Sequence, residues 1–528
     1  MLQRHPNWTA FLLIGLFWAV VLTSSGALFS GYHFMDDHEI AAIHYSLTVQ
    51  KTPFWEMVSQ WLQADYGQSR FRPVYFIGRI IETKVLGLNF WFWSTYKGLL
   101  GVLTAYCLFL FARLLQFTWG EAMLFVALTT LGSQSAIWWQ LGPAETQAMA
   151  FLGLSLLALA LAAANRYRLW AEMAFFGFTL LLSLTKESFI VVIPALIMLK
   201  VGLTMRLGGY SWLQSLQRNL LTALMLLECF GLEILFIYTA LGREPSGTSP
   251  PLGMLLAALG SLHQRGPGWI LLLGLLIIVL KGMAMIPIVG PIVDPVLARF
   301  HRHDVAGNVT PWHITIVGFY ILWVLPQAIL YSGELTQRYL LPGVLAPVLV
   351  SLYLYRWLKQ HYPSLRLLLL VLMGLSLCLR LGTVGQASVR YALEGKSTTA
   401  LLSTIQTRTT PTDPILLVTN PRNYLEWNLS FKRFLTDALD RPNLYFSTYT
   451  APQAAYMERL RQWYNFRSLE KLSDKQRIGC ITIFPLLHPA FLRRSKSWFQ
   501  PERYQQFVFG NFNRNRDPNS EIYLYCKK

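Results

Sequence analysis

The chain has 528 residues, of which 54% are hydrophobic and 14% are charged, and its formal net charge is +18. A water-soluble protein of this length needs far more polar surface, so the composition excludes an ordinary soluble enzyme and places much of the chain in a bilayer. The excess of Lys and Arg is typical of the cytoplasmic loops of a membrane protein, so it does not indicate nucleic-acid binding.

Apolar runs that are long enough to cross a membrane recur from the N-terminus to about residue 383. A transmembrane helix needs about 20 such residues, and the sequence predicts about eleven helices. The first run is too long for a cleaved signal peptide and lacks a small-residue cleavage pattern, so we expect a retained anchor. The predicted spans are 9–30, 94–115, 121–139, 146–164, 171–185, 187–203, 220–241, 268–290, 313–331, 339–356 and 366–383.

A long loop, residues 31–93, connects the first two predicted spans. Apolar residues recur at helical spacing in 53–63 and again in 73–88, with polar residues on the opposite side of each helix. We therefore expect two amphipathic helices that lie in the membrane interface. The alternative is a pair of helices buried inside a soluble loop domain.

The positively charged connections predict the orientation of the helices. If the N-terminus lies in the cytoplasm, the connections that fall on the cytoplasmic side are the ones rich in Lys and Arg. The loop 31–93 and the C-terminus then lie outside the cytoplasm. The basic connections are 165–168, 200–218, 299–303 and 356–366.

The pattern changes near residue 384, where short apolar runs bounded by turn residues or charges replace the long ones. We expect residues 1–383 to form a membrane domain, and residues 384–528 to form a small extracytoplasmic α/β domain that is large enough for its own core. The predicted strands are 415–418 and 478–484, and the predicted helices are 429–439 and 452–464. Two cysteines, Cys480 and Cys526, lie in this domain, and their pairing depends on an oxidising compartment, so the sequence leaves it open.

Two adjacent carboxylates, Asp36 and Asp37, directly follow the first span at the expected outer edge of the membrane. Such a pair suits either a general base that takes a proton from an acceptor hydroxyl or amine, or the ligation of a divalent cation that bridges a phosphate. The alternative is an acidic helix end that is solvated among the headgroups. The neighbouring His38 is interpreted as a structural residue, with a metal ligand as the alternative.

Arginines on the same side are suited to a phosphate, because a guanidinium group offers permanently charged donors in a fork. Arg70 and Arg72 lie between the two amphipathic helices, where binding of anionic lipid is an equal alternative. Arg338 begins an apolar span, and Glu334 is placed four residues before it to orient it by an ion pair. A purely structural ion pair is the alternative.

Three further ionisable residues are expected on this side. Glu145 occupies a short external loop, where the alternative role is a favourable charge at a helix N-terminus, contributing under about 1 kcal/mol. Lys186 and Glu187 separate two short spans and are expected to form an ion pair, since isolated charges are costly at membrane depth. The sequence contains no zinc motif, serine triad or P-loop, which argues against soluble-enzyme chemistry and against direct use of ATP.

The order of these motifs resembles the GT-C superfamily of membrane glycosyltransferases, in particular the branch of protein O-mannosyltransferases and aminoarabinose transferases. The resemblance covers about the first 380 residues, and it depends on the order of the motifs and their shared side of the membrane. The motifs are Asp36-Asp37, Arg70-Phe71-Arg72-Pro73, Gly87-Leu88-Asn89, Glu145, Leu184-Thr185-Lys186-Glu187 and Arg338-Tyr339-Leu340-Leu341-Pro342.

This resemblance implies a polyprenyl-phosphate-linked sugar donor, an extracytoplasmic active site and an inverting transfer with an aspartate as the base. Asp37 is the preferred base, although the choice between Asp36 and Asp37 stays open. The candidate ligands of the donor phosphate are Arg70, Arg72, Lys186 and Arg338, and the other candidate substrate-binding residues are Glu145, Glu187 and Glu334. Metal dependence also stays open, with Mg²⁺ or Mn²⁺ as the candidate ion and Asp36, Asp37 and Glu145 as its candidate ligands.

The expected partners are the lipid-linked donor, membrane lipid, and an acceptor that is a glycan, a lipid or a protein. The expected location is a bacterial inner membrane. The main alternative is a transporter or flippase of a lipid-linked or anionic substrate, a class that commonly has internal repeats and broken helices. The sequence has no convincing internal repeat. A second alternative is an assembly or ligand-binding protein that acts through its soluble domain.

Overall fold

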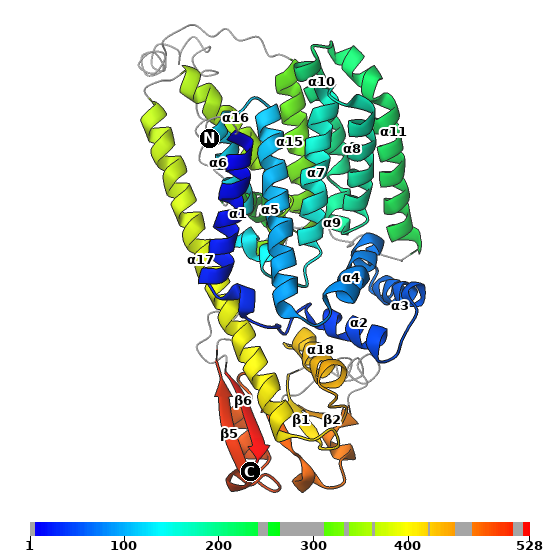
Figure 1. Ribbon diagram of the computed structural model, residues 1–528, viewed down its shortest axis with the longest axis vertical. Helices are drawn as coiled ribbons and strands as arrows, with labels where there is room; N and C mark the ends of the chain where they lie inside the picture. The colour runs from blue at the N-terminus through cyan, green and yellow to red at the C-terminus, as the bar shows by residue number, and fades with distance from the viewer. Residues whose placement is uncertain are drawn as a thin grey trace.

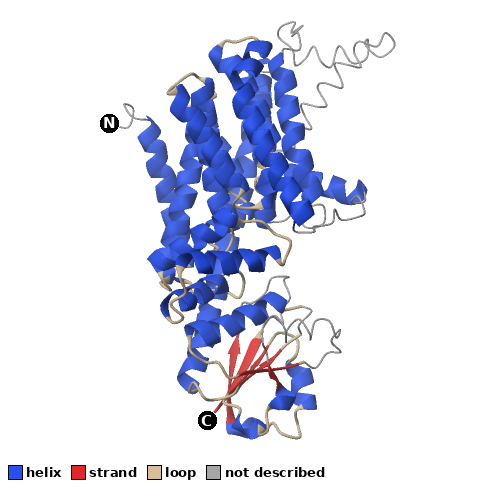
Figure 2. Ribbon diagram, turned by 90° about the vertical axis from the view of Figure 1, so that its right-hand side faces the viewer, coloured by secondary structure: helices blue, strands red, loops and turns tan. Residues whose placement is uncertain are grey.

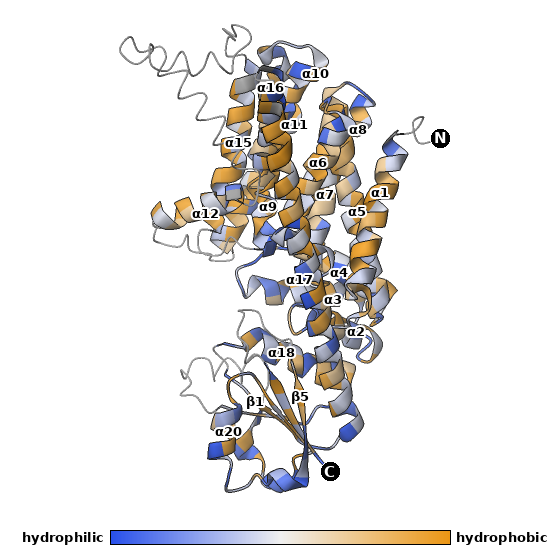
Figure 3. Cartoon of the chain, turned by 90° about the vertical axis from the view of Figure 1, so that its left-hand side faces the viewer, coloured by the Kyte–Doolittle hydropathy of each residue, from blue (hydrophilic) through white to orange (hydrophobic). Residues whose placement is uncertain are grey.

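The computed structural model describes residues 6–240, 252–264, 311–331, 337–361, 365–420, 423–448, 467–510 and 521–528. These residues form a helical bundle and a small domain at one end of it, which contains all the described strands (Figures 1 and 2). The expected fold class, a mostly helical polytopic membrane protein with a small C-terminal α/β domain, is confirmed. Figure 3 shows that hydrophobic residues concentrate on the bundle and that the C-terminal domain is more hydrophilic.

The bundle forms because its helices are apolar over most of their surface, which suits burial in lipid or against other helices. Within the described residues, six helices are long and apolar enough to cross a membrane. Each predicted span overlaps a helix except 187–203, which is divided between two helices, and 268–290, which lies outside the described residues. The bundle helices are α1 (Pro6–Ser24), α5 (Phe90–Leu114), α6 (Trp119–Thr130), α7 (Glu145–Ala163), α8 (Arg168–Ser183), α9 (Glu187–Ile190), α10 (Ile193–Gly208), α11 (Trp212–Leu235), α12 (Leu252–Gln264), α15 (Pro311–Leu330), α16 (Leu345–His361) and the first part of α17 (Arg366–Arg408).

Two helices differ most in length from their predicted spans. The helix α6 ends at Thr130 rather than near residue 139, because Gly132 turns the chain with a φ of +111°, a conformation that favours glycine. A short 3₁₀ helix, η2 (Ser133–Trp138), follows this turn. The helix α17 continues past residue 383 as far as Arg408, and its second half runs along the C-terminal domain (Figure 1). The expected domain boundary therefore falls inside one continuous helix.

Three short helices lie between the bundle and the C-terminal domain (Figure 1). They are α2 (His38–Thr48), α3 (Phe54–Tyr66) and α4 (Pro73–Leu86). The last two are the predicted amphipathic helices, whereas α2 has no counterpart in the prediction. Ile43 of α2, Met57 of α3 and Ile80 of α4 pack in a common buried cluster, so the three helices form one layer over the end of the bundle.

The C-terminal domain contains a six-stranded sheet of order β3-β2-β1-β4-β6-β5. The first four strands in this order are parallel to one another, β6 is antiparallel to β4, and β5 is antiparallel to β6. The strands are β1 (Ile415–Val418), β2 (Leu444–Ser447), β3 (Arg467–Ser468), β4 (Cys480–Ile483), β5 (Tyr504–Phe509) and β6 (Ile522–Lys527), and the helices are α18 (Leu425–Arg433) and α20 (His488–Arg494). The predicted strands 415–418 and 478–484 and the start of the predicted helix 429–439 are confirmed, and 452–464 lies outside the described residues.

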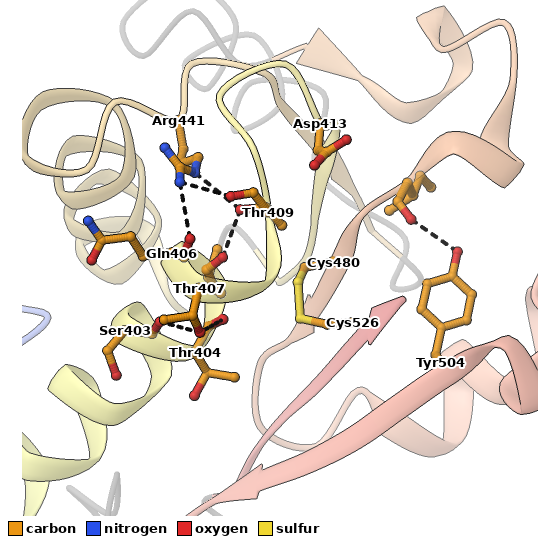
Figure 4. Close-up of a disulfide and its surroundings, with 12 residues drawn as sticks. Ser403, Thr404, Gln406, Thr407, Thr409, Asp413, Arg441, Cys480, Tyr504 and Cys526 are labelled. Carbon is orange, nitrogen blue, oxygen red and sulfur yellow. Dashed lines mark hydrogen bonds between the residues drawn. A yellow bond between two sulfur atoms is a disulfide. The ribbon is translucent and has the colours of Figure 1, made fainter. Parts of the chain in front are cut away.

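A disulfide bond joins Cys480 of β4 to Cys526 of the neighbouring strand β6 (Figure 4). The sequence left this pairing open. Next to the disulfide, Arg441 donates hydrogen bonds to the hydroxyl and the carbonyl group of Thr409 at 3.2 and 2.8 Å. These bonds fasten the chain that follows α17 to the sheet.

Candidate active site

The two aspartates that follow α1 lie in a tight turn whose position is fixed by the C-terminal domain. Phe34 is fully buried in a cluster of aromatic residues of that domain, and its ring centroid lies 5.9 Å from that of Trp427 and 6.1 Å from that of Phe484. Asp36 has a φ of +56° and begins the turn into α2. The C-terminal domain therefore holds the segment that carries both aspartates.

Asp37 is committed to bonds within the protein. Its Oδ2 atom accepts a hydrogen bond from the amide of His33 at 3.1 Å and lies 3.3 Å from Nδ1 of the same residue. Its Oδ1 atom accepts from the amide of Gly142 at 3.1 Å. Asp37 is 1% exposed, so its carboxylate joins two loops and leaves little surface for a substrate.

The turn at Gly142 is held in place from both sides. A Cβ atom added to Gly142 would lie 1.9 Å from the Cβ atom of Asp36, so only glycine permits this approach. On the other side, Arg79 donates to the carbonyl groups of Leu141 and Gly142 at 2.9 and 2.6 Å, and the hydroxyl of Tyr75 donates to Gly142 at 2.9 Å. These contacts fix the backbone against which Asp36 lies.

Asp36 forms an ion pair with Arg338, with 2.5 Å between Oδ2 and Nη1. The side chain of Asp36 is 29% exposed and that of Arg338 is 19% exposed. Burial lowers the pKa of Arg338, but the carboxylates of Asp36 and Glu145 outweigh it and raise this pKa well above its ordinary value. The arginine is therefore permanently charged and partly accessible.

Glu145 continues this arrangement towards Lys186. Its Oε1 atom lies 3.8 Å from Nε of Arg338 and accepts a hydrogen bond from Nζ of Lys186. Lys186 and Arg338 also lie 5.1 and 5.2 Å from the centre of the Tyr339 ring. Asp36, Arg338, Glu145 and Lys186 thus form a row of alternating charges, which we call the charge row. It gathers residues from four separate segments of the chain.

The expected ion pair between Lys186 and Glu187 is wrong, because the two side chains have different partners. Lys186 binds Glu145, whereas Glu187 accepts a hydrogen bond from the amide of Phe71 at 3.0 Å. Glu334 lies outside the described residues, and Arg338 pairs with Asp36 and Glu145.

The two arginines between the amphipathic helices differ in their surroundings. Arg72 binds Asp65, with 2.5 Å between Nη2 and Oδ1 and 3.2 Å from Nε to each carboxylate oxygen. Burial raises the pKa of Asp65, and Arg72 opposes this shift. Arg70 is exposed. Arg72 is therefore already bound within the protein, and Arg70 is the more accessible of the two cations.

Three residues near the site are absent from the candidates that the sequence suggests. Asp65 and Arg79 belong to helices whose polar residues look like ordinary solvated positions. Lys97 is 1% exposed on α5 and lies close enough to Asp37 and Glu145 to interact with them electrostatically. It is the one of the three that was detectable, because it is an ionisable residue inside a predicted span.

The expected metal ligands do not fit a divalent cation. Asp36 and Glu145 both face Arg338, and no group of three or more His, Cys, Asp or Glu side chains suited to a metal occurs among the described residues. Hard divalent cations in proteins take about six oxygen ligands or more. Cationic side chains occupy the space between these carboxylates instead.

No protein-family model and no curated protein matches the chain. Among solved structures, it is similar to ArnT from Cupriavidus metallidurans bound to undecaprenyl phosphate, with 12% identity over 97% of each chain and a TM-score of 0.49. The apo state of the same ArnT gives 14% identity over 98% of each chain and a TM-score of 0.37. The apo form of the Archaeoglobus fulgidus oligosaccharyltransferase is 10% identical, the match covers 100% of this chain and 77% of that chain, and the TM-score is 0.45.

Proposed function

We propose that this protein is a membrane glycosyltransferase that moves a sugar from a polyprenyl-phosphate donor to an extracytoplasmic acceptor, with inversion at the anomeric carbon. The charge row is the observation that carries the proposal. It places a partly accessible carboxylate beside two cations, at the end of an apolar bundle and next to a soluble domain. The bundle suits the polyprenyl chain, the cations suit the phosphate, and the carboxylate suits the acceptor.

Asp36 is the general base in this proposal. A base must reach the proton that it removes, and the Asp36 side chain is 29% exposed. Asp37, which the sequence favours, already accepts hydrogen bonds from His33 and Gly142 and is almost completely buried. Its role in this proposal is to fix the turn that carries Asp36.

The transfer is a single displacement. Asp36 takes the proton of the acceptor hydroxyl or amine, and the acceptor atom forms a bond to the anomeric carbon of the donor sugar. The bond from this carbon to the phosphate oxygen breaks, and its electron pair leaves with the phosphate. Arg338 and Lys186 stabilise the negative charge that develops on the leaving phosphate, a task for which preorganised cations are effective. The proton stays on Asp36 until water removes it.

The soluble domain is placed to border the acceptor side of this site. Phe34 and His38 both connect the aspartate segment to it, since the hydroxyl of Ser430 lies 2.6 Å from Nδ1 of His38. The orientation that we propose puts this domain outside the cytoplasm, where its disulfide is stable. The acceptor is a glycan, a lipid or a protein, and the membrane is a bacterial inner membrane.

The proposal is tested by donor turnover. The purified protein in nanodiscs is incubated with a panel of polyprenyl-phosphate sugars and candidate acceptors, and donor loss is followed by mass spectrometry. We expect one donor to be consumed by the wild type and by Glu172→Gln. The latter is a control because Glu172 pairs with Lys200 far from the charge row. Lys186→Gln is expected to lose about 100-fold or more of the rate.

Transport is the competing outcome. If the folded wild type consumes no donor from a broad panel but moves a lipid-linked or anionic substrate across liposome membranes, the charge row serves a transporter and the proposal is wrong.

A further inference from the structure

We propose that the donor phosphate takes Arg338 away from Asp36, so that the base becomes active only when the donor is bound. This inference rests on the proposed function, because it assigns the phosphate and the base to the same site. It goes further in making Arg338 a shared residue that couples the two substrates. The donor must then bind before the acceptor loses its proton.

Each of the three side-chain nitrogen atoms of Arg338 already has a polar neighbour. Its Nη1 atom binds Asp36 at 2.5 Å, its Nη2 atom donates to the hydroxyl of Tyr339 at 3.3 Å, and its Nε atom lies 3.8 Å from Glu145. Strong binding of a phosphate by a guanidinium group uses two parallel donors. A phosphate that takes two parallel donors of Arg338 therefore competes for this guanidinium group with the two carboxylates beside it.

Of the two carboxylates beside Arg338, Asp36 gives way at the lower cost. The side chain of Glu145 is 2% exposed and is also held by Lys186, whereas that of Asp36 is 29% exposed. A carboxylate that loses its cation needs water or another donor in its place, and a buried one pays the larger desolvation penalty. Water reaches Asp36 and does not reach Glu145, so the exchange occurs at Asp36.

The pair between Arg72 and Asp65 shows the contrast. Asp65 has a side chain that is 1% exposed, and Arg72 contacts both of its oxygens. Releasing Arg72 would leave a buried, unpaired carboxylate. Arg338 is thus the arginine that can exchange its carboxylate for a phosphate, and Arg72 is the one that remains bound to its carboxylate.

The exchange has a chemical consequence. While Arg338 holds Asp36, the carboxylate is stabilised as an anion and is a weak base. When the phosphate takes over the guanidinium group, Asp36 loses that stabilisation and becomes a stronger base at the moment when a donor is present. An acceptor or a water molecule that arrives before the donor therefore meets an inactive base.

Binding of undecaprenyl phosphate, a leaving product of the proposed reaction class, tests the exchange without requiring turnover. Its dissociation constant is measured in nanodiscs by intrinsic tryptophan fluorescence for the wild type, Asp36→Asn, Arg338→Gln and the double variant. Asp36→Asn removes the competitor for Arg338, so it is expected to tighten binding by about five-fold or more. Arg338→Gln weakens binding, and adding Asp36→Asn to it is expected to give no further gain. Glu172→Gln, the matched loss of a paired carboxylate elsewhere, leaves binding unchanged.

The possible results separate the two proposals. If Asp36→Asn binds undecaprenyl phosphate no better than the wild type, the exchange is wrong. It is also wrong if Asp36→Asn tightens binding equally with and without Arg338, because the substitution then acts only by removing a nearby negative charge. Thermal unfolding of each variant shows that it is folded. If the folded wild type and Asp36→Asn both fail to bind undecaprenyl phosphate, the proposed function fails and the exchange fails with it.

Discussion

Asp36 and Arg338 are separated by 302 residues along the chain and by 2.5 Å in the structure. Their ion pair connects the segment after the first helix to the segment before α16, and Glu145 adds the start of α7. Motifs that are weak one by one in the sequence therefore meet in one site. The proposed base therefore has a cation beside it, and the anionic donor phosphate competes with the base for that cation.

Removing the Asp37 carboxylate is expected to destabilise the protein. Asp37→Ala leaves the amides of His33 and Gly142 without their acceptor in a buried place, at a cost of about 2 to 4 kcal/mol. Thermal unfolding in detergent should show a clear loss. Asp36→Asn is the control and should melt close to the wild type, since a partly exposed ion pair contributes about 1 kcal/mol or less. Equal melting of Asp37→Ala and the wild type would contradict a structural role for Asp37.

The turn at Gly142 is expected to tolerate no side chain. In Gly142→Ala the new Cβ atom meets the Cβ and backbone atoms of Asp36, so the turn must move and the aspartate moves with it. We expect donor turnover to fall by about 100-fold or more, because small displacements of catalytic groups have effects of this size. Gly120→Ala is the matched control, since nothing lies within 4 Å of its added Cβ atom. A Gly142→Ala enzyme with the wild-type rate would remove this constraint.

Acid is expected to weaken the attachment of α2 to the C-terminal domain. Burial and the nearby Arg433 lower the pKa of His38 to about 3, with a small opposing effect of Asp36, so the folded protein keeps this residue neutral. An unfolded histidine has its ordinary pKa of about 6.5 and takes up a proton first as the pH falls. The His38 contribution is therefore fully present above about pH 6.5 and is lost as the pH falls towards 3.

Unfolding measured between about pH 7.5 and about pH 5 tests this expectation. The loss assigned to His38 is about 2 kcal/mol at about pH 5. Glutamine does not titrate in this range. Between these two pH values His38→Gln should therefore lose about 2 kcal/mol less unfolding free energy than the wild type. An identical pH dependence for the two proteins would mean that His38 does not determine it.

The orientation predicted from the basic loops can be read by chemical labelling. Gln68 lies in the exposed turn between α3 and α4, and Arg166 lies in the exposed connection at the opposite end of the bundle. We expect a membrane-impermeant maleimide to label Gln68→Cys in intact cells and to label Arg166→Cys only after the membrane is opened. The free cysteines Cys107, Cys229 and Cys378 are replaced beforehand. The reverse labelling pattern would invert the orientation and place the charge row in the cytoplasm.

Hydropathy and periodicity predicted the helices well because apolar length and helical spacing are local properties of a sequence. The partners of charged side chains are not local. Lys186 is next to Glu187 in the chain, yet it binds Glu145, which lies on a different helix. In the same way, residues 384–408 look like part of a soluble domain by composition. They continue α17 without a proline to stop it, and Leu401 and Ile405 pack into the core of the C-terminal domain.

The choice between two adjacent aspartates also lay beyond the sequence. Asp36 and Asp37 are the same residue type, so the sequence does not distinguish them. The fold shows that Asp37 faces two backbone amides and that Asp36 faces an arginine. The backbone also differs at the two positions, because Asp36 has a positive φ and Asp37 is in the right-handed helical region. Burial and bonding of each carboxylate could then be compared directly.

The rate of sugar transfer by Asp36→Asn, measured under single-turnover conditions next to its binding of undecaprenyl phosphate, tests the central claim most directly. The account predicts that transfer falls by about 100- to 10,000-fold, the range of a lost general base, while the protein stays folded and binds the phosphate at least as tightly as the wild type. A transfer rate close to that of the wild type would contradict it, and would show that Asp36 is not the base.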